Sequence, residues 1–489
     1  MKYLLGVDFG GGASKATLLC ENGQIAAEAV EEYPTAYPKP GWAEQNPDDW
    51  YFALRKNVKT LLDKSGVSAG DIQAIALDAA THTAVLTDAA FVPLRPAIYW
   101  TDTRCTREAQ ELEKSYGEQI GEIMYHRPDT IWTLPQLLWV KNHEPEIWER
   151  TCRIMFAKDY VRHQLTGDFV TDKIEAEGSM LFDYRRMDWS AELLDLLKLD
   201  RSVLPELCDP SDTVGTVSEK AARETGLVQG TPVLCGTTDT VMEVFASGAV
   251  QPGQMTVKLA TAGRICVVTQ RAYPNRHLIN YSHVIDGLWY PGTATKSSAA
   301  SLRWYRDAFG GSYRELDQAA EKIPIGCEGL VFHPYLTGEL TPYGDPALRG
   351  SFVGVGAGHT KAHFDRAVLE GVALSLLDCK RALDQLGIPY ENRASVIGGG
   401  SKSPLWRRIL SDCLNLTLVE KVCSDSSLGS AMLAGVASGV FSSFEEAAEK
   451  CSRVKTVTEP NSENHAAYVK CYDRYKQIHD ALAPIYHQK

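Results

Sequence analysis

The chain has 489 residues, of which 44% are hydrophobic and 23% are charged, and its formal net charge is −12. This balance is typical of a globular protein with large cores and argues against a disordered chain, and the length predicts two or three domains. The acidic charge argues against a general nucleic-acid binder, although it permits a local basic pocket for nucleotide phosphates.

The 12 cysteines include no C-x-x-C pair, so their spacing fits neither a zinc site nor a compact disulfide framework. The apolar segment at the start is too short for a signal peptide, and no apolar run approaches the length that spans a membrane. We therefore expect reduced thiols in a cytoplasmic protein that has neither a membrane nor a nucleic acid as partner.

The first predicted elements are three antiparallel strands, at residues 3–7, 16–20 and 25–30. A glycine-rich corner separates the first two strands, and a turn at residues 21–24 joins the second strand to the third.

Helices and strands alternate after these three strands, which predicts an α/β fold. Helical periodicity covers residues 48–63, strands are predicted at 72–77 and 84–86, and the alternation continues to about residue 247.

A second strand–corner–strand unit opens the other half of the chain, with strands at residues 255–259 and 264–269 around a small-residue corner at 260–263. Later predicted elements are a strand at 395–397, a helix from Pro404 to about Leu414 and an amphipathic helix at about 465–486. The repeated unit suggests two related domains that face one another, at residues 1–247 and 248–489.

The first corner places a carboxylate, Asp8, at the end of a buried strand and follows it with Gly10, Gly11 and Gly12. Glycines let backbone N–H groups approach anionic oxygens, and a carboxylate can hold Mg²⁺. A tight hairpin with a solvated aspartate explains this tract equally well on its own. The corner is not a Walker A loop, and no G-x-G-x-x-G occurs in the chain.

A second candidate carboxylate is Asp239, which an apolar strand at about residue 233 delivers to the start of a predicted helix. Such an aspartate could accept a proton from a substrate hydroxyl, as phosphoryl transfer requires. Taken in isolation, the tract is better explained by an N-cap, because Asp and Thr are the residues that capping prefers.

The third candidate is the strand–glycine–helix junction of Gly398, Gly399 and Gly400, which Ser403 follows. It can bring a nucleotide base or a phosphate close to the backbone. A plain strand-to-helix turn is the alternative, although three consecutive glycines exceed what a turn needs.

In order and spacing, these motifs resemble the FGGY carbohydrate kinases of the actin/Hsp70-type ATPase superfamily, over nearly the whole chain from Tyr3 to about Gly439. Several tracts are most similar to the D-xylulokinase branch of that family: residues 40–47 (PGWAEQNP), 81–83 (THT), 97–104 (AIYWTDTR), 157–160 (AKDY), 165–167 (LTG), 334–339 (PYLTGE) and 397–400 (IGGG).

The resemblance implies an α/β fold of two RNase H-like domains with a catalytic cleft between them. The N-terminal domain, 1–247, would bind the sugar and Mg²⁺, and the C-terminal domain, 248–489, would bind ATP and carry the final helix. A small-molecule sugar and ATP would be the partners, with a possible homodimer as is common in such kinases. Domain closure would exclude water, and catalysis would consist of alignment and charge neutralisation.

The resemblance also implies roles for individual residues. Asp8 would position Mg²⁺, and Asp239 would be the base that deprotonates the attacking hydroxyl. The sugar pocket would include His82, Trp100, Asp102, Arg104, Asp239 and Thr240. The nucleotide would be bound at Gly10, Gly11, Gly12, Ser14, Lys15, Thr261, Gly263, Gly398, Gly399, Gly400 and Ser403.

The sequence departs from the family pattern at four positions: Gly11, Ala260, Thr240 and Leu340. At Gly11 the family usually has a threonine, so its hydroxyl contact to phosphate is lost or comes from elsewhere, with Ser14 and Lys15 as candidates. Thr240 stands where xylulokinases commonly carry an asparagine beside the base, which alters the hydroxyl pattern that the pocket can satisfy.

The leading hypothesis is an ATP-dependent kinase that converts D-xylulose to D-xylulose 5-phosphate. Kinases for ribulose, L-xylulose, a polyol or a sugar acid are the alternatives within the family. A non-catalytic ATP-binding sugar sensor is the alternative from another class, and the retained pair Asp8 and Asp239 argues against it.

Overall fold

The computed structural model describes residues 1–275 and 277–488 and divides into two compact units. The first unit consists of Met1–Val250, Tyr281–Asp286 and Cys423–Ser452. The second unit consists of Gln251–Asn280, Gly287–Val422 and Arg453–Lys489.

The first unit is built on a seven-stranded sheet, in which six strands follow the order β13-β14-β5-β1-β2-β3 and β15 pairs with β5. Strands β1 and β2 are antiparallel, as are β2 and β3, whereas β1, β5 and β14 run parallel. The strands are β1 (Tyr3–Phe9), β2 (Ala13–Cys20), β3 (Ile25–Glu32), β5 (Ile72–Ala79), β13 (Thr213–Thr216), β14 (Pro232–Leu234) and β15 (Thr237–Thr238).

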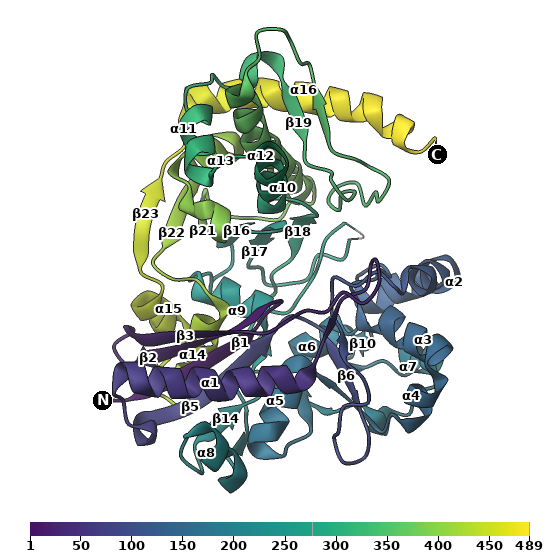
Figure 1. Cartoon of the computed structure of the whole chain (residues 1–489), viewed down its shortest axis with the longest axis vertical. Coiled ribbons are helices and arrows are strands. Elements are labelled where there is room, and N and C mark those ends of the chain that lie inside the picture. Colours follow the sequence, from purple (N-terminus) through teal and green to yellow (C-terminus); the bar gives the residue numbers. More distant parts are fainter. Residues whose placement is uncertain (276, 489) are drawn as a thin grey trace. The chain divides into compact units, whose positions relative to one another are not determined.

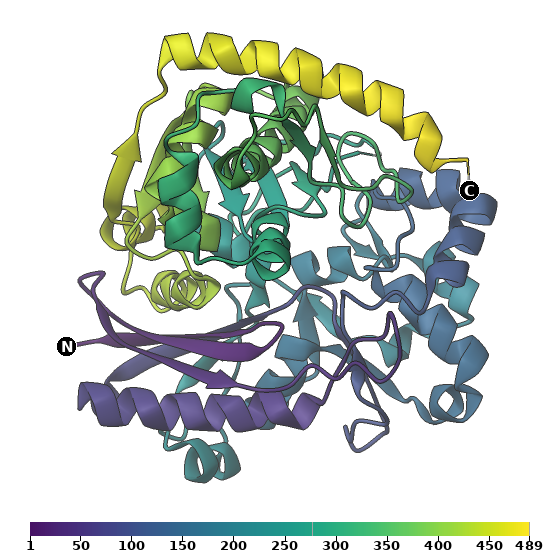
Figure 2. The same cartoon turned by 45° about the horizontal axis from the view of Figure 1, so that its top comes forward.

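Helices cover both faces of this sheet. Helix α1 (Pro47–Ser65) packs on β2 and β3, and α14 (Ser426–Ala437) packs on β1, β5 and β2. Figures 1 and 2 show α1 along one face of the strands. Side chains of β1 alternate between the faces, so Val7 joins the core against α1 while Gly6 meets the backbone of α14.

The sequence determines where α1 begins and ends. Asn46 caps the helix by accepting a hydrogen bond from the backbone N–H of Asp48, and Pro47 occupies the first turn, where its missing N–H costs nothing. Gly66 ends the helix in the left-handed conformation, with a φ of 67°.

The remaining elements of the first unit lie in the long excursions between the sheet strands and after residue 422. They are β4 (Glu44–Gln45), β6 (Ala84–Thr87), β7 (Ala97–Ile98), α2 (Thr106–Met124), α3 (Thr133–His143), α4 (Pro145–Arg150), β8 (Arg153–Phe156), α5 (Ala157–Thr166), β9 (Val170–Asp172), α6 (Lys173–Gly178), β10 (Phe182–Asp183), β11 (Asp188–Trp189), α7 (Ala191–Leu197), β12 (Glu206–Cys208), α8 (Glu219–Thr225), α9 (Asp239–Ala246) and α15 (Phe444–Cys451).

The second unit repeats the sheet of the first. Its six strands follow the order β18-β17-β16-β21-β22-β23, with two antiparallel pairs, two parallel pairs and a final antiparallel pair. They are β16 (Met255–Leu259), β17 (Gly263–Val267), β18 (Gly292–Thr295), β21 (Arg393–Ile397), β22 (Thr417–Lys421) and β23 (Val454–Thr458). The prediction of two related α/β units, each opening with strand, small-residue corner and strand, is therefore confirmed.

Helix α12 (Lys361–Gln385) is largely buried in the core of the second unit. The long final helix, α16 (Ser462–Tyr486), packs on α13 (Pro404–Leu414) and on β19 (Val331–His333), and Figure 2 shows its continuous course. The unit also contains α10 (Ala299–Phe309), α11 (Tyr313–Ala320) and β20 (Ser351–Val353).

The two units do not correspond to a single cut after residue 247. The first unit ends close to that point, at Val250, but the chain returns to it at Tyr281–Asp286 and at Cys423–Ser452. The second return is a packing requirement, because α14 covers the face of β1 and β5 that α1 leaves open.

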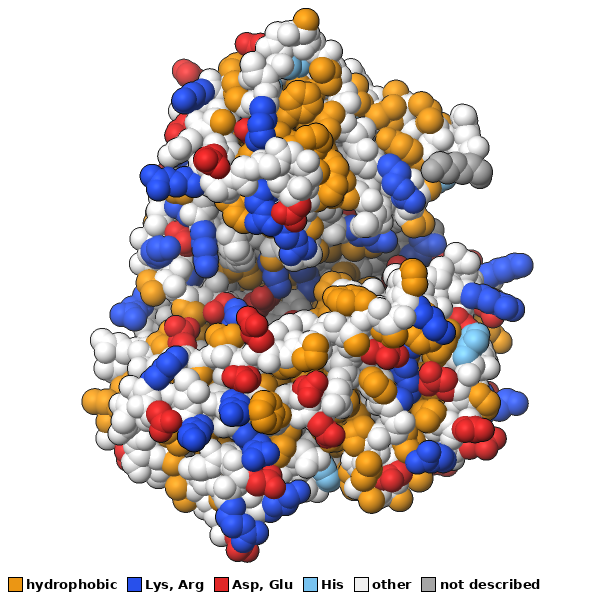
Figure 3. All heavy atoms as spheres, viewed as in Figure 1, with side chains coloured by type: hydrophobic (Ala, Val, Ile, Leu, Met, Phe, Trp, Pro, Cys, Tyr) orange, Lys and Arg blue, Asp and Glu red, His pale blue; other side chains and the backbone are white. Residues whose placement is uncertain are grey.

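The distribution of surface charges and the absence of disulfides among the described residues are consistent with the composition. On the face drawn in Figure 3, acidic and basic side chains are interspersed. No disulfide joins the twelve cysteines, all of which lie among the described residues; eight of them are buried and four are half-buried. None of the described helices combines the length and apolar character needed to cross a membrane.

Candidate active site

Three strands of the first unit end side by side and deliver the candidate catalytic residues. Asp8 in β1 is the register partner of Asp78 in the parallel strand β5, and Thr237 in β15 is the partner of Asp78 on its other side. Because parallel strands end at the same edge of a sheet, Asp8 and Asp239, which follows β15, lie at one edge. The two carboxylates that sequence analysis selected are therefore brought together.

Burial and mutual repulsion perturb these carboxyl groups. Burial raises the pKa of Asp8 to about 7, and the charge of Asp239 adds to this effect. Burial also raises the pKa of Asp78 well above its ordinary value, and the charge of Asp8 raises it further. Ser430 of α14 donates a hydrogen bond of 2.6 Å to Oδ2 of Asp78. A concentration of carboxylates with raised pKa values is a common property of functional sites.

The carboxylate of Asp239 is held through one oxygen. Thr81 and Thr240 each donate a side-chain hydrogen bond of 3.1 Å to Oδ1. Among the described residues none donates to Oδ2, and Asp239 is half-exposed. The N-cap of α9 is Thr238 rather than Asp239, so the N-cap interpretation of Asp239 is wrong and its carboxylate is available to a ligand.

Hydrogen bonds to its carbonyl groups fix the backbone of the first glycine corner. Tyr33 donates a hydrogen bond of 2.7 Å to the carbonyl of Gly10, and Gln45 donates one of 3.1 Å to the carbonyl of Gly11. The carbonyl of Gly12 accepts from the backbone N–H of Tyr33 at 3.1 Å. Gly11 and Gly12 are exposed residues, and their N–H groups have no acceptor among the described residues, as anion binding requires.

Ser14 and Lys15 point to opposite faces of β2. Ser14 is fully buried and its hydroxyl lies 3.1 Å from the side-chain amide of Asn57 on α1, so the structure does not support a phosphate contact by Ser14. Lys15 forms an ion pair of 3.4 Å with Asp425. Burial lowers the pKa of Lys15, but the charges of Asp425 and then of Asp8 outweigh burial and raise it.

His82 is fixed at the same edge of the sheet, just after β5. Its backbone N–H donates to Glu175, its carbonyl accepts from Thr133 at 2.7 Å, and its ring packs against Trp132 with centroids 5.0 Å apart. Burial lowers the pKa of His82 to about 3. The imidazole is therefore neutral at physiological pH and suited to hydrogen bonds with uncharged hydroxyl groups.

The predicted sugar-pocket residues on the loop after β7 fall into two groups. Trp100 is exposed and can meet a ligand. Asp102 is fully buried, with both oxygens engaged by Arg104, and Oδ2 also by the backbone N–H of Ala43. Arg104 in turn stacks on Trp42 at 3.7 Å. Asp102 and Arg104 are thus arranged to fix this loop rather than to contact a sugar directly.

The second unit carries the other predicted corners, again at one sheet edge. Lys258 in β16 is the register partner of Ile397 in the parallel strand β21, so the corner of Thr261 and the Gly398 tract emerge next to each other. The carbonyl of Ala260 accepts a hydrogen bond of 2.7 Å from the N–H of Ala299, the first residue of α10, and the carbonyl of Thr261 accepts one of 2.9 Å from the N-cap, Ser298. Gly263 donates its N–H to the side chain of Thr295 at 3.1 Å.

The three glycines after β21 have different reasons to be glycine. Gly398 has a φ of 91°, and a Cβ there would lie 2.7 Å from the carbonyl oxygen of Leu259. A Cβ on Gly400 would lie 2.7 Å from the side chain of Leu259, whereas one on Gly399 would meet nothing within 4 Å. Ser403 caps α13 by accepting from the N–H of Trp406. Tight packing accounts for Gly398 and Gly400, and only Gly399 is exposed.

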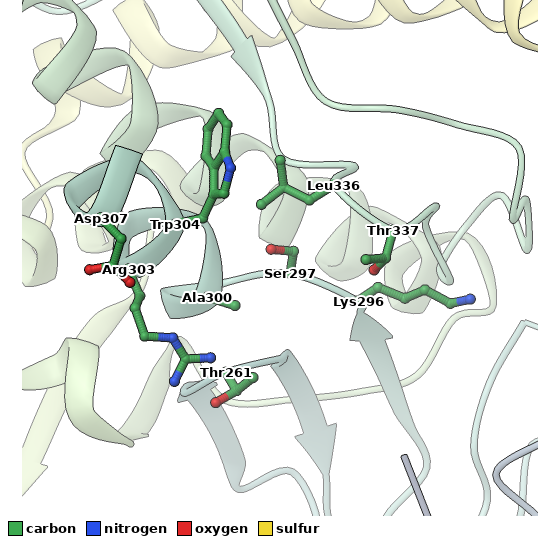
Figure 4. A pocket seen from close by; sticks show the side chains of 9 residues that line it. All are labelled: Thr261, Lys296, Ser297, Ala300, Arg303, Trp304, Asp307, Leu336 and Thr337. Carbon is green, nitrogen blue, oxygen red and sulfur yellow. The ribbon is translucent and has the colours of Figure 1, made fainter. Parts of the chain in front are cut away.

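A pocket of about 470 Å³ opens beside the Thr261 corner in the second unit. Figure 4 shows Arg303 reaching from α10 toward Thr261, with Lys296 and Trp304 also on the rim. Its lining consists of Thr261, Lys296, Ser297, Ala300, Arg303, Trp304, Asp307, Leu336 and Thr337. Two cations, an aromatic ring and several hydroxyl groups suit a ligand that carries both a ring and an anionic group.

Sequence analysis missed several residues of these two sites. Asp78 had a detectable signal, because it is the one charged residue of a mostly apolar strand and stands next to its end. Thr81 lies in the tract of residues 81–83 (THT), but no role for it follows from the sequence. No local pattern marks the pocket residues Lys296, Arg303 and Trp304, because the packing of α10 and of the segment before it against the corner brings them to the pocket.

The chain is similar to known proteins along its whole length. It matches the FGGY family of carbohydrate kinases, N-terminal domain, over residues 3–246 and C-terminal domain over residues 233–438. Xylulose kinase of Bacillus subtilis (strain 168) is 33% identical over 486 residues, which cover 98% of this chain and 97% of the relative.

Two solved structures show the same likeness in three dimensions. Xylulose kinase from Rhodospirillum rubrum matches with a TM-score of 0.91 at 27% identity and covers 100% of both chains. Gluconate kinase from Lactobacillus acidophilus matches with a TM-score of 0.93 at 26% identity, over 100% of this chain and 99% of the other.

Proposed function

Because the chain belongs to the FGGY family of carbohydrate kinases, we propose that it transfers the γ-phosphoryl group of ATP to a hydroxyl group of D-xylulose. The protein is a phosphotransferase, and its two sheets have the RNase H-like α/β topology of the actin-type ATPase fold. The choice of xylulose among sugars follows the relatives named xylulose kinase.

The observation that carries this proposal is the arrangement of Asp239. Its Oδ1 accepts from two threonines while its Oδ2 is open at the edge where Asp8 and the glycine corner also lie. A carboxylate held by one oxygen presents the other to a substrate hydroxyl in a fixed direction, which is the geometry that a general base needs.

In the proposed reaction, the hydroxyl oxygen of the sugar attacks the γ-phosphorus while its proton passes to Oδ2 of Asp239. The bond between the γ-phosphorus and the bridging oxygen breaks, and ADP leaves with that electron pair. The exposed N–H groups of Gly11 and Gly12 stabilise the charge on the transferred group.

Magnesium would enter as part of the MgATP substrate, and the donor set fits it. Asp8 supplies a hard carboxylate oxygen. Burial and then the charge of Asp239 raise its pKa, and a bound divalent cation would offset both effects by favouring the ionised carboxylate. Bound Mg²⁺ would neutralise charge on the phosphate oxygens, and Asp8 would orient it directly or through water.

The pocket beside Thr261 supports a nucleotide site in the second unit. Arg303 and Lys296 can pair with phosphates, and the indole of Trp304, 40% exposed, offers an aromatic surface. Gly399 is the part of the glycine tract that has free space for an approaching adenosine.

The proposed function is tested by a coupled ADP-release assay with D-xylulose, L-xylulose, ribulose, glycerol and gluconate. D-xylulose is expected to give the highest kcat/KM. Preference for gluconate would assign the chain to the gluconokinase branch, to which a relative from Bacillus subtilis and the Lactobacillus structure belong by name. If no sugar raises turnover above the ATPase background, the chain is a nucleotide-binding sensor and the proposal fails.

Asp239→Ala provides the matched control for that assay. It should abolish phosphoryl transfer and leave sugar binding measurable by calorimetry, since the carboxylate is needed for the proton and not for the pocket. Near-normal turnover of this variant would remove Asp239 from its role.

We further propose that the protein works in the cytoplasm, where ATP and free sugars meet, and that it forms a homodimer as such kinases commonly do. Light scattering of the purified protein tests the second statement, and a mass of one chain would contradict it.

A further inference from the structure

The space that a side chain at residue 11 would occupy is filled by Tyr99. A Cβ on Gly11 would lie 2.8 Å from the hydroxyl oxygen of Tyr99 and 3.3 Å from its Cζ. The phenol of Tyr99 therefore occupies the position into which any side chain at residue 11 would project. A glycine at position 11 and a tyrosine at position 99 are therefore sterically linked, because the phenol needs the space that a side chain at residue 11 would take.

Tyr99 is held firmly enough to place its hydroxyl. Its backbone N–H donates to the carbonyl of Ala43 at 2.9 Å, and its carbonyl accepts from the N–H of Asp102 at 2.9 Å. Asp102 is locked in turn by its ion pair of 2.7 Å with Arg104. The ring is buried among Ala43 and Ala80, with 7% of the residue exposed. This is why Asp102 and Arg104 are buried: they anchor the loop that carries Tyr99.

The hydroxyl of Tyr99 lies in the field of both catalytic carboxylates. Burial raises the pKa of Tyr99, and the charges of Asp239 and then of Asp8 raise it as well. The phenol therefore stays protonated and acts as a hydrogen-bond donor at physiological pH. Among the described residues its O–H donates to no acceptor, and it lies beside Gly11 at the glycine corner.

Ser14 and Lys15, the two candidates that the sequence offered, fill this place less well, and the hydroxyls of Tyr33 and Thr35 already donate to the carbonyls of Gly10 and Gly11. The hydroxyl of Ser14 is in the core, beside Asn57. Lys15 is 3.4 Å from Asp425 and is drawn toward that carboxylate. A phosphoryl oxygen at the glycine corner needs a donor that no protein acceptor already engages, and the hydroxyl of Tyr99 beside Gly11 is such a donor.

We propose that the hydroxyl of Tyr99 replaces the side-chain hydroxyl absent at Gly11 and donates a hydrogen bond to an oxygen of the phosphoryl group bound at the Gly10–Gly12 corner. The inference rests on the proposed kinase function, and it adds a substrate-contacting residue from the loop after β7 (Ala97–Ile98). Tyr99 forms no bond in the reaction; it stabilises negative charge on the oxygen that it touches.

The first test removes only the hydroxyl. Tyr99→Phe is expected to lower kcat on the order of 10²-fold, as the loss of a donor to developing charge does, with KM for the sugar within about twofold. Calorimetry gives a readout besides activity: binding of the magnesium complex of the ATP analogue AMP-PNP should weaken, and binding of the sugar alone should not. Tyr160→Phe, which removes a buried phenol that donates to Asp48 in the same unit, is the matched control and should change neither quantity.

The second test moves the hydroxyl back to residue 11. Gly11→Thr alone should be harmful, because its Cβ would overlap the phenol. Tyr99→Leu alone should resemble Tyr99→Phe. The double variant Gly11→Thr/Tyr99→Leu should exceed both single variants in kcat and in AMP-PNP affinity, because a threonine then has both the space and the hydroxyl.

The outcomes separate this inference from the proposed function. If Tyr99→Phe keeps wild-type kcat and AMP-PNP affinity, or loses affinity for the sugar alone, the inference is overturned. If the double variant is no better than Tyr99→Leu, replacement of one hydroxyl by the other is overturned. If the wild type phosphorylates no sugar but Tyr99→Phe still weakens AMP-PNP binding, the kinase proposal fails while the phosphate contact of Tyr99 stands.

Discussion

The hydroxyl of Thr81 donates a hydrogen bond of 3.1 Å to Oδ1 of Asp239, across 158 positions of sequence. Thr81 follows β5 and Asp239 follows β15, and those strands are parallel neighbours. The bond therefore ties the proposed base to the strand that also carries Asp78, and it fixes the direction in which the free oxygen of Asp239 points.

Loss of this bond should lower activity without loss of the fold. Thr81→Val keeps the shape and removes the donor, so kcat should fall on the order of tenfold while KM for the sugar changes little. Thr81→Ser keeps a hydroxyl and should recover most of the activity. Thr83→Val is the control, because among the described residues the Thr83 hydroxyl has no hydrogen-bond partner. Equal activity of Thr81→Val and wild type would show that Thr240 alone orients Asp239.

Arg303 should affect the nucleotide and not the sugar. Arg303→Met removes a cation from the rim of the pocket beside Thr261 and keeps much of the side-chain volume. We expect the Kd for MgATP to rise roughly tenfold, the value of one charge-assisted hydrogen bond. Calorimetry with AMP-PNP and with the sugar checks this, with Arg314→Met on the neighbouring helix α11 as a control. A change in sugar affinity alone would contradict a nucleotide site there.

Glu339 should make the stability of the second unit depend on pH. It is buried, accepts hydrogen bonds from the backbone N–H groups of Lys296 and Leu340, and has a pKa that burial raises to about 7. Below about pH 4.5 both the folded and the unfolded forms are protonated. Between about 4.5 and 7 the unfolded chain releases its proton while the folded chain keeps it, so stability falls as pH rises.

Glu339→Gln removes this titration and keeps an oxygen acceptor for the two N–H groups. The variant should gain up to about 3 kcal/mol over wild type between pH 4.5 and 8, measured by urea unfolding at both values. Glu391→Gln, an exposed position in the same unit, controls for the loss of one charge. A pH dependence that is the same in Glu339→Gln and in wild type would contradict the prediction.

Gly6 should tolerate no side chain. A Cβ there would lie 2.0 Å from the carbonyl oxygen of Ser427 and 2.3 Å from the N atom of Ala431, both backbone atoms of α14. Gly6→Ala must therefore push α14 away from β1, and we expect a loss of stability of about 3 kcal/mol or more. Gly121→Ala in α2 meets nothing within 4 Å and should be neutral or stabilising by up to about 1 kcal/mol. Thermal unfolding of the two variants makes the comparison, and equal midpoints would refute the close contact.

The sequence was most informative where the fold depends on local patterns. The predicted strands at residues 3–7 and 255–259 and the helix starting at Pro404 are present, because apolar runs that end at glycines, and a capped proline start, act within a few residues. The same patterns identified Asp8 and Asp239 as strand-end carboxylates. Their neighbours at the sheet edge follow from strand order, which no short window of sequence contains.

Other features of the site required contacts between distant segments. The hydroxyl of Ser14 and the carboxylate of Asp102 were both expected to meet ligands, yet protein groups surround each of them. Nothing near Gly11 in the sequence indicates that Tyr99, 88 positions later in the printed chain, fills its side-chain space. The return of Cys423–Ser452 to the first unit depends in the same way on the narrow fit of Gly6 against α14.

That return has a consequence for how the protein is made. A ribosome delivers β1 at the start of synthesis, but it releases α14, which covers one face of β1, only after most of the second unit has been translated. The amino-terminal sheet must therefore wait with an uncovered apolar face while the chain grows, which makes it a natural client for chaperones during translation. A fragment that stops at Val250 would carry that exposed face permanently.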